Sequence, residues 1–331
     1  MSQLPFIDAE VAAAVGGRLV PPGPLLSPGE VADVVDGLRA AAAASVAPVA
    51  RVTGLDADAG GPMLVVDRPT WIRANADMAL TMLAEATGGP YPAPERLRDK
   101  VAARANGAQL GMALAAFGAR ILGQYLPFLA EPRLVLVAPN VAKIERAMGV
   151  DPDDFRLWVC LHEQTHRLQF ARAPWLRGHL LAAVGELIDG DAPAPEAGAA
   201  GGRRRPRSIV DVVTSPGQQE VFERVSAVMS LLEGYADDMM DRVGPDVVPT
   251  VATIRRRFDA RRNRGGWTKV LNNALGMDLK LAQYRDGAAF CREVIARVGV
   301  TGLNAVYDRP ENLPSPGEIE APARWIHRVH G

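Results

Sequence analysis

The chain has 331 residues, of which 48% are hydrophobic and 23% are charged, and its formal net charge is −1 at pH 7. This composition is ordinary for a globular protein large enough to bury a substantial core, as one large domain or as two closely packed ones. The near-zero net charge argues against broad binding to nucleic acid or to an anionic membrane, so we expect neither as a partner.

The first 130 residues are expected to be mainly helical. Ser27-Pro28-Gly29-Glu30 is typical of a helix start, with a serine N-cap, a proline in the first turn and a glutamate that closes a capping box. This helix is predicted to stop near Pro48, and a short strand is predicted over residues 63–66, after a Gly-Gly-Pro turn. A further helix follows the strand, and residues 94–126 are predicted to form one long helix or two abutting helices.

Residues 131–331 are expected to form a catalytic part, onto which the N-terminal part, residues 1–130, packs to give one compact unit. The strongest strand prediction is Leu134–Val137, which is short, apolar and bounded by prolines. An exposed edge of this strand could bind an extended peptide by main-chain pairing, or the strand could be an ordinary part of the core. Residues 189–207 are rich in Gly, Ala and Pro and predict a flexible loop that ends in the basic cluster Arg203–Arg207.

The segment Asp151–Ala173 predicts a helix with a defined start and stop. Asp151 is a good N-cap, and Pro152 suits the first helical position. Two further aspartates in the first turn complement the positive end of the helix dipole, and Pro174 ends the helix.

This helix contains the sequence His162-Glu163-Gln164-Thr165-His166, which fits the pattern H-E-x-x-H. Residues four apart lie about one turn apart on the same helix face, so both imidazoles can reach one point. That is half of a tetrahedral zinc site, and Glu163 is placed to act on a water bound to the metal. The alternative interpretation is two surface or core histidines that happen to lie one turn apart.

A catalytic zinc usually takes three protein ligands and keeps a fourth position open. The next histidine, His179, follows thirteen residues after His166 and lies beyond Pro174, which excludes the metzincin spacing. A carboxylate on a later segment is the other common solution, and the available ones are Glu186, Glu220, Glu223, Glu233, Asp237 and Asp241.

Glu233 is the favoured third ligand for two reasons. Gly234 beside it would allow the backbone to approach the motif helix closely. Asp237 follows four residues later on the same face, where it could accept a hydrogen bond from the second ring nitrogen of a ligating histidine. A glutamate ligand with an aspartate four residues on is the arrangement of thermolysin-like zincins, and the alternative is a solvated acidic face.

The chain resembles the actinobacterial zincin-like metallopeptidases of type 2. The resemblance covers nearly the whole chain and lies in the segments Val65–Trp71, Ala74-Asn75, Trp158–Phe170, Leu232–Asp237 and Gly276–Tyr284. It implies a predominantly helical α+β fold of the zincin-like metalloprotease type, with a small β-sheet beside the H-E-x-x-H helix. Members are often labelled as associated with deazaflavin coenzyme biosynthesis, a label that reflects genomic company.

These residues predict a zinc-dependent metallopeptidase or amide hydrolase that acts on a peptide or amide substrate. Zn²⁺ would be held by His162, His166 and Glu233, and Glu163 would take a proton from the zinc-activated water. Tyr284 is predicted as a catalytic donor to the oxyanion, with Lys280 and Tyr235 as other candidates. Two alternatives are a zinc-stabilised binding protein without catalysis, associated with cofactor biosynthesis, and a metal-free helical scaffold.

The cysteines and the N-terminus bear on the cellular compartment. Cys160 and Cys291 provide no disulfide framework, which favours a reducing environment, and Cys160 is expected to be a small core residue. The N-terminus lacks the basic and apolar regions of a signal peptide, so we expect a cytoplasmic protein. The apolar stretch Gly107–Ala130 contains polar side chains and is expected to be buried rather than to span a membrane.

Overall fold

The computed structural model describes residues 6–55, 60–86, 88–189, 216–264 and 282–331. The predicted flexible loop 189–207 therefore lies outside the described residues, apart from Asp189, which ends a helix. The larger helices of the described part are α1 (Ala9–Leu19), α2 (Pro28–Thr53), α3 (Arg68–Ala86), α4 (Leu97–Gly118), α5 (Ala138–Met148), α6 (Pro152–Arg172), α7 (Trp175–Asp189), α8 (Pro216–Val243), α9 (Val251–Arg264) and α11 (Ala282–Leu303).

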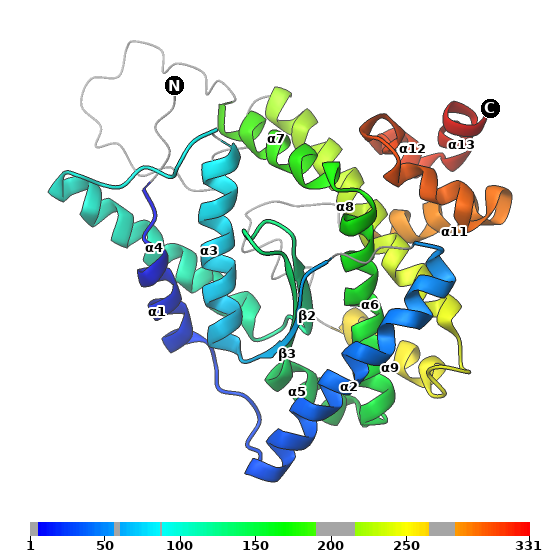
Figure 1. Ribbon diagram of the computed structural model, residues 1–331, viewed down its shortest axis with the longest axis horizontal. Coiled ribbons are helices and arrows are strands. Elements are labelled where there is room, and N and C mark those ends of the chain that lie inside the picture. The colour runs from blue at the N-terminus through cyan, green and yellow to red at the C-terminus, as the bar shows by residue number, and fades with distance from the viewer. Residues whose placement is uncertain (1–5, 56–59, 87, 190–215, 265–281) are drawn as a thin grey trace.

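The chain closes with two short 3₁₀ turns and two short helices, namely η2 (Asn304–Tyr307), η3 (Pro310–Asn312), α12 (Pro316–Glu320) and α13 (Pro322–His330). Within the described residues, three strands form one sheet: β1 (Met63–Val66), β2 (Gly123–Leu126) and β3 (Arg133–Val137). The predominantly helical α+β fold with a small sheet beside the motif helix is confirmed, and Figure 1 shows the sheet between α3 on one side and α6 on the other.

The strand predicted most strongly is the central strand of the sheet. The strand order is β1-β3-β2, with β1 parallel and β2 antiparallel to β3. Because β3 is paired along both edges, the prediction that its edge could receive an extended peptide is wrong, and the alternative of a core strand is right. Its side chains alternate between two apolar clusters: Leu134 and Leu136 face the α6 side, and Val135 and Val137 face Trp71 on α3.

Two helix predictions in the N-terminal half differ from the structure. The capping box at Ser27 and Glu30 is present, but α2 continues through Pro48 and ends only at Gly54, which has a φ of 63°. The buried side chains of Val49 and Thr53 explain this, since their packing outweighs the cost of an internal proline, about 3 kcal/mol. Residues 94–126 form α4 and then β2 rather than helix throughout, because pairing with β3 outweighs local preference.

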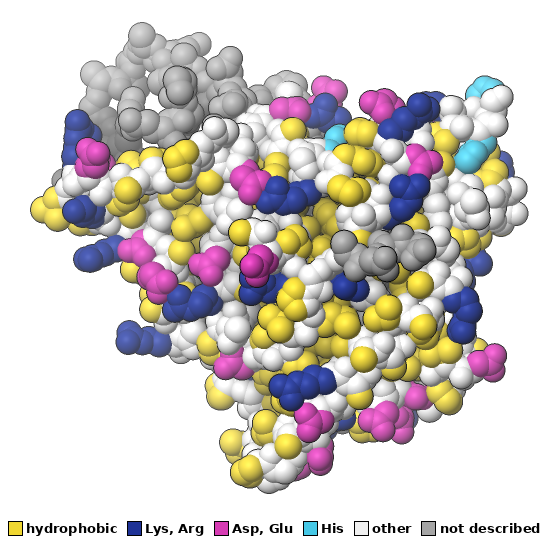
Figure 2. All heavy atoms as spheres, viewed as in Figure 1, with side chains coloured by type: hydrophobic (Ala, Val, Ile, Leu, Met, Phe, Trp, Pro, Cys, Tyr) yellow, Lys and Arg dark blue, Asp and Glu magenta, His cyan; other side chains and the backbone are white. Residues whose placement is uncertain are grey.

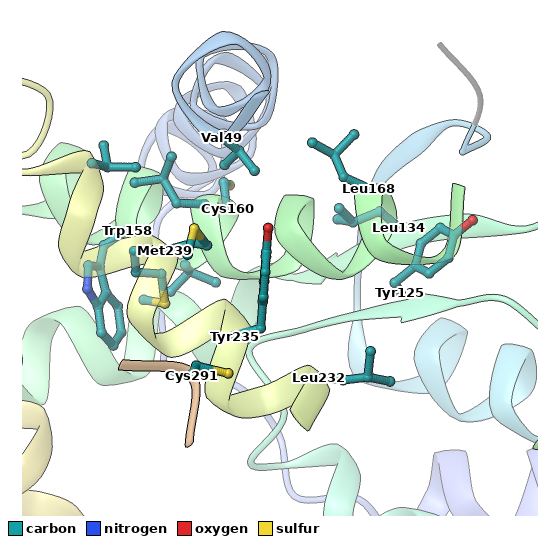
Figure 3. Packing of buried hydrophobic residues seen from close by; sticks show 14 of the residues in the cluster. Val49, Tyr125, Leu134, Trp158, Cys160, Leu168, Leu232, Tyr235, Met239 and Cys291 are labelled. Atoms are coloured by element: carbon teal, nitrogen blue, oxygen red, sulfur yellow. The ribbon is translucent and has the colours of Figure 1, made fainter. Parts of the chain in front are cut away.

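Helix α6 forms as its sequence predicts. The Asp151 side chain accepts hydrogen bonds from the main-chain N–H groups of Asp153, at 3.1 Å, and Asp154, at 3.0 Å, and Pro152 occupies the first turn. Apolar side chains of α6 enter the larger of the two apolar clusters, together with α2, α8 and α11. Figure 3 shows part of this cluster, in which Tyr235 extends from α8 toward α6. Both cysteines are buried and free, so Cys160 is a core residue as expected.

The exposed face in Figure 2 carries both signs of charge. Lysine and arginine side chains are interspersed with aspartate and glutamate, and hydrophobic side chains gather in the middle of this face. Within the described residues, no helix combines the length and the apolarity needed to span a bilayer.

Helices α8 and α11 cross at two glycines. A Cβ atom added to Gly234 would lie 2.2 Å from the carbonyl carbon of Gly287, and one added to Gly287 would lie 1.9 Å from the oxygen of Ser230. The close approach at Gly234 therefore exists, but the prediction that it would be to the motif helix is wrong, since the neighbour is α11. Gly234 thus holds the turn that carries Glu233 by allowing backbone contact with α11.

The Gly234→Ala variant is expected to lower the free energy of unfolding by about 1–3 kcal/mol, because the new methyl group would collide with backbone rather than with a mobile side chain. Urea denaturation measures this change. Gly178→Ala is the matched control: Gly178 is an exposed helical glycine on α7 with no described heavy atom within 4 Å of its added Cβ, so it should gain about 0.5–1 kcal/mol. Parental stability of Gly234→Ala would contradict the packing role of the crossing.

Candidate metal centre

Helices α6 and α8 bring three side chains that are far apart in sequence to one point. The Nε2 atoms of His162 and His166 lie 3.0 Å apart. Glu233 reaches both rings, with Oε2 3.4 Å from Nε2 of His162 and Oε1 3.6 Å from Nε2 of His166. These ligand atoms all lie within 4.8 Å of one another, which makes this trio a candidate metal site within the described residues.

The geometry of the trio fits zinc. Zinc bonds to histidine nitrogen and carboxylate oxygen at about 2.0–2.2 Å, so two ligands of a tetrahedral ion lie about 3.3 Å apart. The two ring nitrogens lie 3.0 Å apart, and each lies 3.4 or 3.6 Å from a different oxygen of the Glu233 carboxylate, distances close to this value. Two imidazoles and one carboxylate are also a donor set that zinc prefers, and three protein ligands leave the fourth position for water or substrate.

The charges in the trio favour a cation. Burial acts to raise the pKa of Glu233, but the imidazoles of His166 and His162 outweigh burial and lower the pKa to about 2. Burial lowers the pKa of His162, but the Glu233 carboxylate more than compensates and raises the pKa to about 9. The pKa of His166 is lowered, mainly by burial. Glu233 is therefore ionised at neutral pH and His162 is protonated beside it, so the trio already holds one positive charge, which a metal ion would replace.

Glu163 lies next to His162 on α6, and its side chain meets strand β2. Its exposed fraction is 7%, and a Cβ atom added to Gly123 of β2 would lie 2.6 Å from Cγ of Glu163. Burial raises the pKa of this carboxyl group to about 7; the nearby His162 acts to lower it and Glu233 to raise it. A buried carboxyl group with a pKa near neutrality is suited to exchange a proton during a reaction.

The structure does not give Asp237 the predicted place behind a histidine. Its carboxylate accepts a hydrogen bond from Nη1 of Arg255 on α9, at 2.9 Å. Arg255 also pairs with Asp241 at 2.6 Å and lies over the ring of Trp158. The physical reason is the competition for Asp237: a guanidinium on a neighbouring helix is a stronger partner than an imidazole N–H.

Other groups stand behind the two imidazoles. Nδ1 of His166 lies 2.9 Å from Oε1 of Gln169, and Nδ1 of His162 lies 3.1 Å from the sulfur of Met240. Neither group was predicted from the sequence. Gln169 could have been found from its position three residues after His166, since side chains at that spacing are neighbours on a helix. Met240 carried no such signal, because it lies on another helix.

The proposed oxyanion donors are placed as follows. The hydroxyl group of Tyr235 donates to Oδ1 of Asn304 at 2.8 Å, and the residue is fully buried in the core. Tyr284 belongs to the first turn of α11, but its side chain is outside what the structure describes. Lys280 lies outside the described residues.

Comparisons with known proteins agree with this geometry. A family described as zincin-like metallopeptidase matches residues 7–326. A crystal structure of a candidate hydrolase with a novel fold from Chloroflexus aurantiacus is similar over 98% of this chain and 98% of its own, with 30% identity and a TM-score of 0.71. Among curated proteins, none matches the chain.

Proposed function

Because the chain belongs to the zincin-like metallopeptidase family, we propose that it is a zinc-dependent hydrolase of peptide or amide bonds. His162, His166 and Glu233 would hold the zinc, and Glu163 would act as the general base. The observation that carries the proposal is the convergence of three ligand atoms within 4.8 Å of one another, with a buried carboxyl group beside them that is not one of the three. Zinc held there would supply Lewis-acid chemistry, polarising a carbonyl group and lowering the pKa of water to about 7.

Glu163 would move the proton. With a pKa of about 7, its carboxylate can take a proton from the attacking water near neutral pH and deliver it to the leaving nitrogen. The contact with Gly123 supports this role, because the absence of a side chain there lets β2 lie directly against the carboxyl group. The attacking water would thus be activated between α6 and β2.

Strand β2 would also orient the substrate. The N–H of Val137 donates to the oxygen of Leu122, and with the observed register this makes Gly123 and Tyr125 members of non-hydrogen-bonded pairs. Their main-chain N–H and C=O groups therefore point away from β3, toward the edge of the sheet that pairs with no further strand among the described residues. An extended peptide paired with this edge would run past Glu163, so β2 rather than β3 would serve main-chain recognition.

Neither alternative is favoured. A zinc-stabilised binding protein without catalysis gives no reason for a buried glutamate beside the trio, and both comparisons favour a hydrolase. A metal-free scaffold gives no reason for two imidazoles and a carboxylate to converge within 4.8 Å of one another.

The proposal is tested by metal content together with hydrolysis. We expect protein purified without added metal to contain one zinc per chain by elemental analysis, and to cleave members of a peptide library. Treatment with a chelator should abolish cleavage by removing the zinc, and added zinc should restore it. The three protein ligands leave the fourth position of the ion open for water or substrate, so cleavage depends on the ion. A chain that binds no zinc and cleaves the same peptides at an unchanged rate after chelation would overturn the proposal.

A further inference from the structure

A single buried side chain, Gln169, joins the two helices of the trio. It lies three residues after His166 on α6 and has no exposed surface. Its Oε1 faces Nδ1 of His166 at 2.9 Å, and its Nε2 donates to the carbonyl oxygen of Leu232 at 3.1 Å and to the hydroxyl oxygen of Tyr307 at 2.9 Å. One amide therefore contacts α6, α8 and η2.

These contacts determine which way the amide points. The main-chain oxygen of Leu232 can only accept a hydrogen bond, so the NH₂ group of Gln169 must face it. The amide oxygen is then left for His166. Because that oxygen can only accept, Nδ1 of His166 must carry the ring hydrogen. The lone pair of His166 is thereby placed on Nε2, the nitrogen that faces His162 and Glu233.

The same amide also holds the helix turn that carries Glu233. Leu232 directly precedes Glu233, so the hydrogen bond to its carbonyl group connects the third ligand to the motif helix. His162 has a weaker support, since among the described residues its Nδ1 faces the thioether of Met240, a weak acceptor. The orientation of the trio therefore depends most on Gln169.

We infer that Gln169 is a positioning residue of the metal centre: it sets the tautomer and orientation of His166 and holds Glu233 in register with it. For the identity of the ion this inference rests on the proposed function, whereas the tautomer of His166 does not. Because an amide and a thioether, both neutral, stand behind the imidazoles, Glu233 brings the one negative charge among the three ligands and these two supporting groups. A cation held there would therefore remain electron-poor. It would be a stronger Lewis acid than a cation whose histidine ligands are backed by carboxylates.

Zinc affinity tests the inference through three variants. Gln169→Leu should bind zinc about 10–100-fold more weakly in competition with a chromophoric chelator, because His166 loses its orienting acceptor. Gln169→Glu should bind zinc with an affinity between those of Gln169→Leu and the parent, since its carboxylate can accept from Nδ1 of His166 but cannot donate to the carbonyl oxygen of Leu232. Tyr307→Phe removes one hydrogen bond of the same buried network but leaves the contacts of Gln169 with His166 and Leu232, so it should stay within a few-fold of the parent.

The tautomer provides a readout that needs no zinc. In the metal-free parent protein, histidine ring ¹⁵N spectra near neutral pH should show His166 protonated on Nδ1, and Gln169→Leu should lose that signature. If the parent protein shows His166 protonated on Nδ1 but binds no zinc, the proposed function is wrong, whereas the role of Gln169 in setting the tautomer stands.

Parental zinc affinity and an unchanged tautomer in Gln169→Leu would overturn the inference. If Gln169→Leu does not fold, Gln169→Glu decides. In a folded Gln169→Glu protein, a His166 ring that stays protonated on Nδ1 in the ¹⁵N spectra supports positioning, and loss of that signature overturns it.

Discussion

The Glu163→Gln variant should fold and bind zinc like the parent protein but hydrolyse its peptide substrate about a hundred- to ten-thousand-fold more slowly. Glutamine has nearly the same shape as glutamate, so it fits the space beside Gly123. Glu163 is not one of the three converging ligands, so the zinc content should be unchanged. An amide cannot take a proton from water near neutral pH, and the reaction should lose its base.

The measurement is kcat on a cleaved peptide, with zinc content and thermal unfolding recorded on the same samples. Glu293→Gln is the matched control: it is the same chemical change at a partly exposed glutamate of α11 that pairs with Arg297, and its activity should equal that of the parent. Because burial already raises the pKa of Glu163, removing its charge should not destabilise the protein. Hydrolysis by Glu163→Gln at the parental rate would show that another group is the base.

The Glu233→Ala variant should lose zinc rather than only activity. The change removes one of three donors and the negative charge that the two imidazoles share. We expect zinc affinity to fall by more than about a hundred-fold, beyond the loss that follows removal of a residue behind a ligand. Hydrolysis should fall below detection, because the remaining histidines cannot hold the ion in the required geometry.

Elemental analysis and competition with a chelator measure this effect. Glu223→Ala is the control on the same helix, since Glu223 is exposed and accepts a hydrogen bond from Gln219 away from the trio. Helix α8 should remain folded in Glu233→Ala, because its core residues and its crossing with α11 are unchanged. A Glu233→Ala protein with a full complement of zinc at parental affinity would remove Glu233 from the ligand set.

The two variants are expected to differ in metal content, which makes them informative together. Glu163→Gln is expected to keep the metal and lose the chemistry, whereas Glu233→Ala is expected to lose both. A protein in which zinc only stabilises the fold would give a different pattern, with no hydrolysis to lose in either variant and lower thermal stability in Glu233→Ala alone.

Several features could be predicted because they depend on nearby residues. The start of α6 follows from Asp151 and Pro152, whose side chains act within one turn. The spacing of His162 and His166 places both imidazoles on one face of any helix that contains them. The capping box of α2 is local in the same way.

Other features were missed or misplaced because distant contacts decide them. Strand β2 is too short to be distinguished from the end of a helix, and it exists because β3 pairs with it. Gly234 was recognised as a point of close approach, but its partner is Gly287 on α11. Asp237 had suitable spacing to support a histidine, yet Arg255 on α9 binds it.

By itself, the sequence determined the helix that presents two imidazoles and the glutamate between them, since one turn of helix sets their mutual geometry whatever surrounds it. The tertiary structure alone decided that Glu233 meets these imidazoles while Asp237 pairs with Arg255, that Gly123 lies against Glu163, and that Gln169 contacts His166. The physical reason is that each of these contacts joins side chains whose separation depends on how the helices pack and on which polar partner competes best for each group.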